Sequence, residues 1–122
     1  YVAFDNGTAP ETAGTLEEHF VAPEVSALGT GLDPAQGTVS VLQSADRLAV
    51  TYEDMVEVGL DSVSNFQIEL FFEGGVQVTY LDVGATDAIA GLSIGEGLPT
   101  DFVETDFNSD TIHTTESLRS QL

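Results

Sequence analysis

Apolar and polar side chains alternate with a period of two over much of the chain after Gly37. In four segments the apolar residues occupy every second position. This period places the apolar side chains on one face of a strand and the polar ones on the other, so the pattern predicts half-buried antiparallel strands. The predicted apolar faces are Val39 and Val41; Leu48, Val50 and Tyr52; Phe66, Ile68, Leu70 and Phe72; and Val76, Val78 and Tyr80.

Three further segments complete the predicted strands. Residues 1–4 predict a short strand, and residues 24–32 predict a longer one that ends at Asp33-Pro34. Residues 88–94 are apolar with Gly91 inside, which is typical of a strand covered on both faces. The chain is long enough for one domain with a single core.

One helical turn is predicted near residues 15–20. Thr15 and Glu18 have the spacing of a capping box, in which each side chain bonds the backbone of the other. Pro23 follows and stops the helix. Together with the strands, this predicts an all-β fold: an antiparallel β-sandwich with one short helical turn.

The glycines at 74 and 75 predict a hairpin whose register can be derived from its faces. A loop of two residues would put apolar side chains opposite polar ones. A three-residue loop instead puts Phe72 opposite Val76, and all the apolar positions then share a face. Gly75 is expected to take the left-handed conformation that such a loop needs.

The charge is strongly one-sided. The chain has 21 acidic residues and only two basic ones, Arg47 and Arg119, which gives a net charge of −19. Nucleic acid is therefore a poor partner, because its phosphates require cations. Anionic membranes repel such a surface, and no apolar run reaches the roughly 20 residues of a membrane span, so no insertion is expected. Three explanations stay open: solubility, binding of a divalent cation, and a saline or marine setting, which the absence of lysine favours.

The densest cluster of oxygen ligands lies between residues 101 and 110. Part of it has the D-x-N-x-D spacing of a calcium loop, but an EF-hand would need one more residue, a glycine, after Asp110. An irregular Ca²⁺ site is one interpretation, and a solvated acidic loop is the other. The candidate metal ligands are Asp101, Glu104, Asp106, Asn108 and Asp110.

The candidate catalytic groups are weak. Residues 91–95 match G-x-S-x-G around Ser93, yet Gly97 and Pro99 prevent the helix that a nucleophile elbow requires. His19 is expected at a helix cap or on the surface, and His113 in the tail. Carboxylate pairs carry no signal in so acidic a chain, so we expect no enzyme. Phe71 points away from the predicted core face, where it either packs under a loop or marks a surface for a partner or a sugar.

Several segments together carry a resemblance. They read ADRLAVTYED at 45–54, NFQIELFFEGG at 65–75, AIAGLSIG at 88–95 and PTDFVETD at 99–106. The chain resembles, over about residues 1–108, a β-sandwich module of large secreted bacterial proteins that is distantly similar to nidogen-type extracellular domains. Modules of that family are associated with secreted peptidases, hydrolases or adhesive surface proteins and have no assigned activity.

The resemblance implies a sandwich module at 1–108 followed by a polar tail or linker at 109–122. In that family an apolar strand region normally precedes this point, which implies that the domain has different bounds here, or that strands are missing or supplied by another chain. We therefore expect a non-catalytic extracellular or cell-surface module for adhesion, spacing or assembly, with β-strand donation into a homo-oligomer or filament as a specific version. Its partners would be proteins or glycans, and the alternative is a carbohydrate-binding module of a secreted hydrolase.

Overall fold

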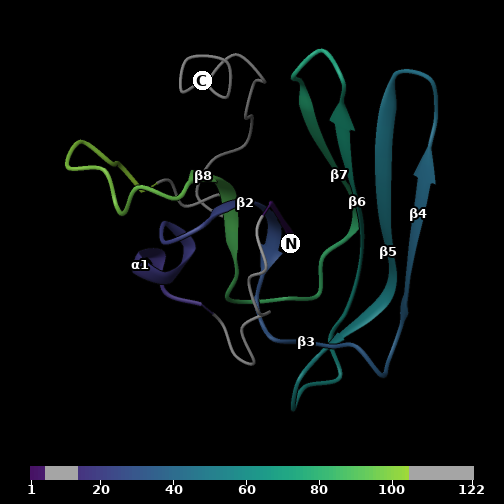
Figure 1. The fold of residues 1–122 in the computed structure, drawn as a ribbon. Helices are drawn as coiled ribbons and strands as arrows, with labels where there is room; N and C mark the ends of the chain where they lie inside the picture. Colours follow the sequence, from purple (N-terminus) through teal and green to yellow (C-terminus); the bar gives the residue numbers. More distant parts are fainter. Residues whose placement is uncertain (5–13, 105–122) are drawn as a thin grey trace.

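The computed structural model describes residues 1–4 and 14–104, and it confirms the predicted all-β class (Figure 1). The strands form two antiparallel sheets, and one short helix lies beside the smaller sheet. The smaller sheet has the order β1-β2-β8; the larger has the order β3-β5-β6-β7, with β4 also paired to β5. The strands are β1 (Val2–Ala3), β2 (Pro23–Gly29), β3 (Leu32–Asp33), β4 (Thr38–Gln43), β5 (Arg47–Glu57), β6 (Val63–Phe71), β7 (Val76–Asp82) and β8 (Ile89–Ile94).

The core lies between the two sheets. Phe66 and Ile68 of β6 are 1% and 0% exposed, and the ring of Tyr52 stacks on Phe66 at 4.5 Å between centroids. The hydroxyl of Tyr80 donates to the carbonyl of Ala27, which ties the larger sheet to the smaller one. Fully burying an apolar side chain such as Ile68 stabilises the folded state by about 1.5–3 kcal/mol. The buried core comprises Val25, Ala27, Leu28, Val50, Tyr52, Met55, Phe66 and Ile68.

The helix α1 (Leu16–His19) begins with the predicted capping box. The Glu18 amide donates to Thr15 Oγ1 at 3.2 Å, and the Thr15 amide donates to Glu18 Oε2 at 2.9 Å. Two amides that the helix leaves unpaired are therefore satisfied. No helix within residues 1–4 and 14–104 has the length and apolarity needed to cross a bilayer. The predicted tail, residues 109–122, lies outside the described part of the chain.

The strand predicted over residues 24–32 is wrong in its extent. The structure divides it into β2 and β3, which belong to different sheets. Between them, Thr30 Oγ1 donates to Glu57 Oε1 at 2.6 Å, so the crossing is held to β5. The crossing itself reads Gly29-Thr30-Gly31, and these two glycines are the break signal that the prediction of one continuous strand passed over.

The β6–β7 hairpin has the predicted loop length and shared face, but the predicted register is wrong by one residue on each strand. Leu70 pairs with Val76, and the Phe71 amide donates to the Gly75 carbonyl at 2.8 Å. The positive φ of 99° falls on Gly74, not on Gly75. Because the left-handed residue closes the loop, the loop is 72–74, and Phe72 is exposed at the turn instead of extending the core face.

Two predictions of burial are also wrong. The strand at residues 88–94 is not covered on both faces: four of the six residues of β8 are only half-buried, and Ile94 is exposed. The strand that contains Val39 and Val41 is not half-buried, because every residue of β4 is exposed. Period-two alternation correctly predicted β4 as a strand, but not whether another layer covers it.

Candidate functional site

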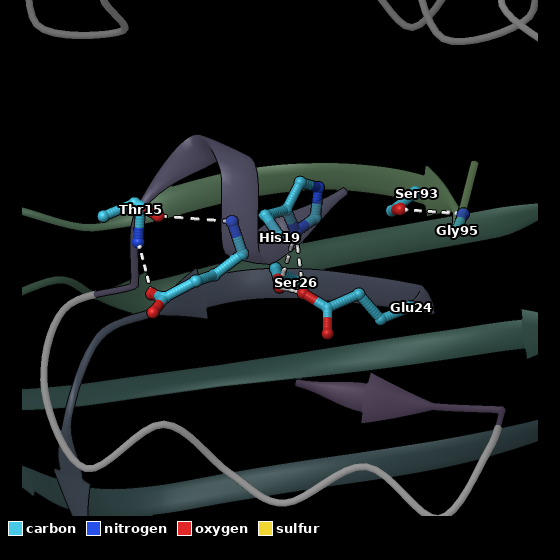
Figure 2. Close-up of polar contacts among 7 residues, drawn as sticks. Thr15, His19, Glu24, Ser26, Ser93 and Gly95 are labelled. Carbon is cyan, nitrogen blue, oxygen red and sulfur yellow. Dashed lines mark hydrogen bonds and ion pairs between the residues drawn. The ribbon is translucent and has the colours of Figure 1, made fainter. Parts of the chain in front are cut away.

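A buried polar cluster lies on the outer side of the smaller sheet, under helix α1 (Figure 2). Glu24 and Ser26 alternate along β2 with core residues, so their side chains point away from the core. His19 is the last residue of α1, which brings its ring over β2. The prediction that His19 is a surface or cap residue is wrong as to exposure, because only 7% of it is accessible.

The cluster is organised around one carboxylate oxygen. Glu24 Oε1 lies 2.7 Å from His19 Nδ1 and accepts a hydrogen bond from Ser26 Oγ at 2.8 Å. Since a carboxylate accepts, this geometry assigns the ring proton to Nδ1. His19 Nε2 has no hydrogen-bond partner among the described residues, and it faces β8 at Gly91, where an added Cβ would lie 3.4 Å away.

A carboxylate that orients an imidazole also occurs in serine hydrolases, where Nε2 must contact a hydroxyl. Ser93 lies directly opposite Glu24 in the β2–β8 register, so it shares their face. Its Oγ accepts from the Gly95 amide at 3.1 Å (Figure 2), and no described hydroxyl contacts Nε2. Ser93 also lies within β8, not at a turn that leads into a helix. Among the described residues, the polar cluster therefore lacks a nucleophile–base contact.

Sequence reasoning missed Glu24 and Ser26. The available signal was two polar positions alternating with Val25 and Ala27, shortly after a helix with a histidine in its last turn. A polar face of that kind normally faces water, and only the fold shows that α1 covers it.

The predicted metal ligands are described only in part. Asp101 and Glu104 are exposed, whereas Asp106, Asn108 and Asp110 lie outside the described residues. The ring of Phe102 packs edge-on against Phe20 at 5.2 Å, which fixes the start of this segment beside α1. Among the described residues, no group of three or more metal-binding side chains is arranged around one point.

Phe71 packs instead of standing free. The Arg47 guanidinium lies 5.4 Å from the centre of its ring and also forms an ion pair with Glu69 at 3.1 Å. A shallow hollow of about 350 Å³ lies next to it at the hairpin ends, lined by Asp46, Phe71, Phe72 and Glu73. Phe72, predicted as a core residue, is the exposed aromatic of this hollow.

The largest departure from an ordinary sandwich is β4. Val39, Val41 and Leu42 are 52%, 63% and 70% exposed. Val41 pairs with Val50 and Val39 pairs with Tyr52, so these valines lie on the same face of the sheet as the core. Figure 1 shows β4 at the side of the larger sheet, away from β2 and β8. The apolar face of the larger sheet thus extends beyond the part that the smaller sheet covers.

Comparisons with protein families, with curated proteins and with solved structures gave no match.

Proposed function

We propose that this chain is a non-catalytic extracellular module that mediates assembly or adhesion within a larger secreted or cell-surface protein. The exposed strand β4 is the observation that carries this proposal. Natural proteins protect exposed sheet edges with charges, prolines or bulges, because an open edge accepts further strands. Residues 38–43 contain none of these protective residues.

The distribution of charge supports the same function. The acidic residues that surround β4 in the sequence give a solvated, self-repelling surface. Residues 34–45 are the longest stretch of the chain without a charged side chain, and they contain β4. A neutral, apolar strand on so acidic a protein offers a place of contact, where a strand of another chain can extend the sheet.

A synthetic peptide with the sequence of residues 36–44 tests whether the edge accepts a strand. Labelled peptide should bind the whole chain in a fluorescence anisotropy titration, and a scrambled peptide should not. In the whole chain, Val41→Pro should abolish binding of the unsubstituted peptide. Val41→Thr, which keeps the backbone amide and the approximate size of the side chain, should retain most of the binding. Equal binding of both peptides, or none, contradicts the proposal.

A carbohydrate-binding function is the second candidate, and the hollow at Asp46, Phe71, Phe72 and Glu73 favours it. An exposed aromatic ring can stack on a sugar, and carboxylates beside it can accept hydrogen bonds from the sugar's hydroxyl groups. A glycan array should then show a specific signal that Phe72→Ala removes. The absence of any glycan signal for the unmodified chain eliminates this candidate.

Calcium binding by the acidic segment stays a prediction. If Asp101, Glu104 and the other predicted ligands (Asp106, Asn108 and Asp110) hold Ca²⁺, the melting temperature should rise with Ca²⁺ and fall with chelator, because a ligand of the folded state stabilises it by mass action. NaCl at matched ionic strength is the control. An equal rise with NaCl and with Ca²⁺ contradicts a specific site.

A further inference from the structure

The outer edge of β4 presents a defined row of backbone groups. The Ser44 amide donates to the Arg47 carbonyl at 2.9 Å, which fixes residues 44 and 47 as a hydrogen-bonded pair. In an antiparallel ladder such pairs alternate, so Ser40 and Leu42 direct their amides and carbonyls toward β5. Val39 and Val41 direct theirs away from it. No strand among residues 1–4 and 14–104 pairs with that outer edge.

The charge around this edge indicates which kind of partner strand can bind there. Two copies of the chain repel each other through a net charge of −19 each. Contact between their neutral stretches, residues 34–45, the longest in the chain, places no carboxylate opposite another across the new ladder. A cationic strand would find no carboxylate within β4 to pair with. The uncharged strand is therefore complementary to itself.

We propose that a second copy of this chain pairs its β4 antiparallel with the β4 of the first, so that one sheet runs through both copies. This rests on the proposed function and specifies its partner. The preferred register follows from the side chains: it sets Val39 opposite Val41 of the second copy, and Val41 opposite Val39 of the second copy. Both valine pairs then exchange backbone hydrogen bonds and extend the core face. The interface is isologous, as in most symmetric dimers.

Salt should strengthen this association. Screening shortens the range of repulsion from about 10 Å at about 0.1 M to about 3 Å at about 1 M, while the apolar and backbone contacts persist. A partner attracted by the acidic surface would respond in the opposite way, because salt weakens attraction between unlike charges. The sign of the salt dependence thus separates a second copy from a basic partner.

The register makes Ser40 the test residue. It lies opposite Ser40 of the second copy as a non-hydrogen-bonded pair, with Cα atoms about 4.5 Å apart, which suits a disulfide. Thr38 shares its face and its exposure, but two copies of Thr38 would lie about 13 Å apart, too far to bridge. The chain has no cysteine of its own, so single-cysteine variants are unambiguous.

The experiment uses the whole chain in sedimentation velocity and mild oxidation at low and high NaCl. The expected results are a shift from the 12.9 kDa monomer to twice that mass as NaCl rises, loss of this shift in Val41→Pro, and disulfide-linked dimer for Ser40→Cys but not for Thr38→Cys. A chain that stays monomeric in about 1 M NaCl, or a Thr38→Cys that cross-links as readily as Ser40→Cys, overturns the inference. If the peptide still binds to the monomer, the proposed function stands while this inference fails.

Discussion

Strands β6 and β4 lie in the same sheet and have the same pattern of alternating apolar side chains, yet their surroundings are opposite. Ile68 of β6 is 0% exposed between the two sheets, whereas Val41 of β4 is 63% exposed. Both strands pair with β5, one on each of its edges. Alternation and backbone pairing are therefore enough to place a strand in the sheet, while burial depends on whether the second layer reaches it.

The difference separates two sources of stability. β6 is held by packing, since its side chains fill the space between the sheets. β4 is held mainly by its ladder to β5, because its apolar side chains gain little from burial in the single chain. A strand held in this way keeps its apolar surface available for another molecule.

The largest expected effect comes from deleting packing in β6. Ile68→Ala should lower the free energy of unfolding by about 2–5 kcal/mol, because it opens a cavity in a fully buried site. Val41→Ala should change it by less than about 0.5 kcal/mol, measured by urea unfolding at low salt. If Ile68→Ala fails to fold, Ile68→Val should still cost about 0.5–1.5 kcal/mol. Equal costs at the two strands contradict the contrast.

The attachment of β4 to β5 should depend on backbone geometry at Gly37. A Cβ at Gly37, whose φ is 101°, would lie 2.7 Å from the Glu53 carbonyl oxygen. Gly74 has a similar φ of 99° with no atom within 4 Å, so it is a matched control. Gly74→Ala should cost about 1–2 kcal/mol from the left-handed conformation alone. Gly37→Ala should cost about 2–4 kcal/mol, since the clash adds to it.

A similar loss of unfolding free energy for Gly37→Ala and Gly74→Ala, measured by thermal or urea unfolding, would show that the backbone of β4 and β5 can shift to accommodate the added Cβ. That outcome would remove the argument that β4 is fixed by its backbone. Circular dichroism of the two variants before unfolding checks that each retains its sheet content.

The partly buried hydroxyl of Tyr80, which donates to Ala27, gives the larger sheet a pH dependence. Burial raises the pKa of Tyr80. The folded state therefore holds this proton more tightly than the unfolded state, whose phenol titrates near about pH 10. The resulting stability is fully present below that pH and is lost as the pH rises through the folded pKa.

Urea unfolding between neutral and strongly alkaline pH should show this decline, and Tyr80→Phe should reduce its slope. Near neutral pH, Tyr80→Phe should cost about 0.5–1.5 kcal/mol for the lost hydrogen bond. Burial, and to a smaller extent the charge of Tyr1, also raises the pKa of Tyr52, so part of the decline should persist in the variant. An unchanged slope would contradict the role of Tyr80.

The sequence predicted local features better than global ones. The capping box at Thr15 and Glu18 was found because its spacing acts within one turn of helix. The length of the β6–β7 loop also followed from local pairing, but its register depended on which of two adjacent glycines took positive φ. Side-chain faces are the same in both registers, so the pattern could not distinguish them.

The sequence could not predict which face of each strand is covered by another layer. Val39 and Val50 look alike in the alternation, and only the position of the smaller sheet makes one exposed and the other buried. For the same reason, the sequence did not single out Glu24 and Ser26, whereas in the fold α1 covers Ser26 and brings His19 onto Glu24. The chemistry of a site depends on such tertiary covering, which the period of a strand does not encode.

Amide hydrogen exchange along β4 tests the central claim most directly, because neighbouring residues there have opposite roles. Ser40 and Leu42, bonded to β5, should be protected under all conditions. Val39 and Val41 should exchange rapidly in dilute protein at low salt, and should become protected at high protein concentration in about 1 M NaCl. Fast exchange of Val39 and Val41 under both conditions would contradict pairing of β4 with a second copy.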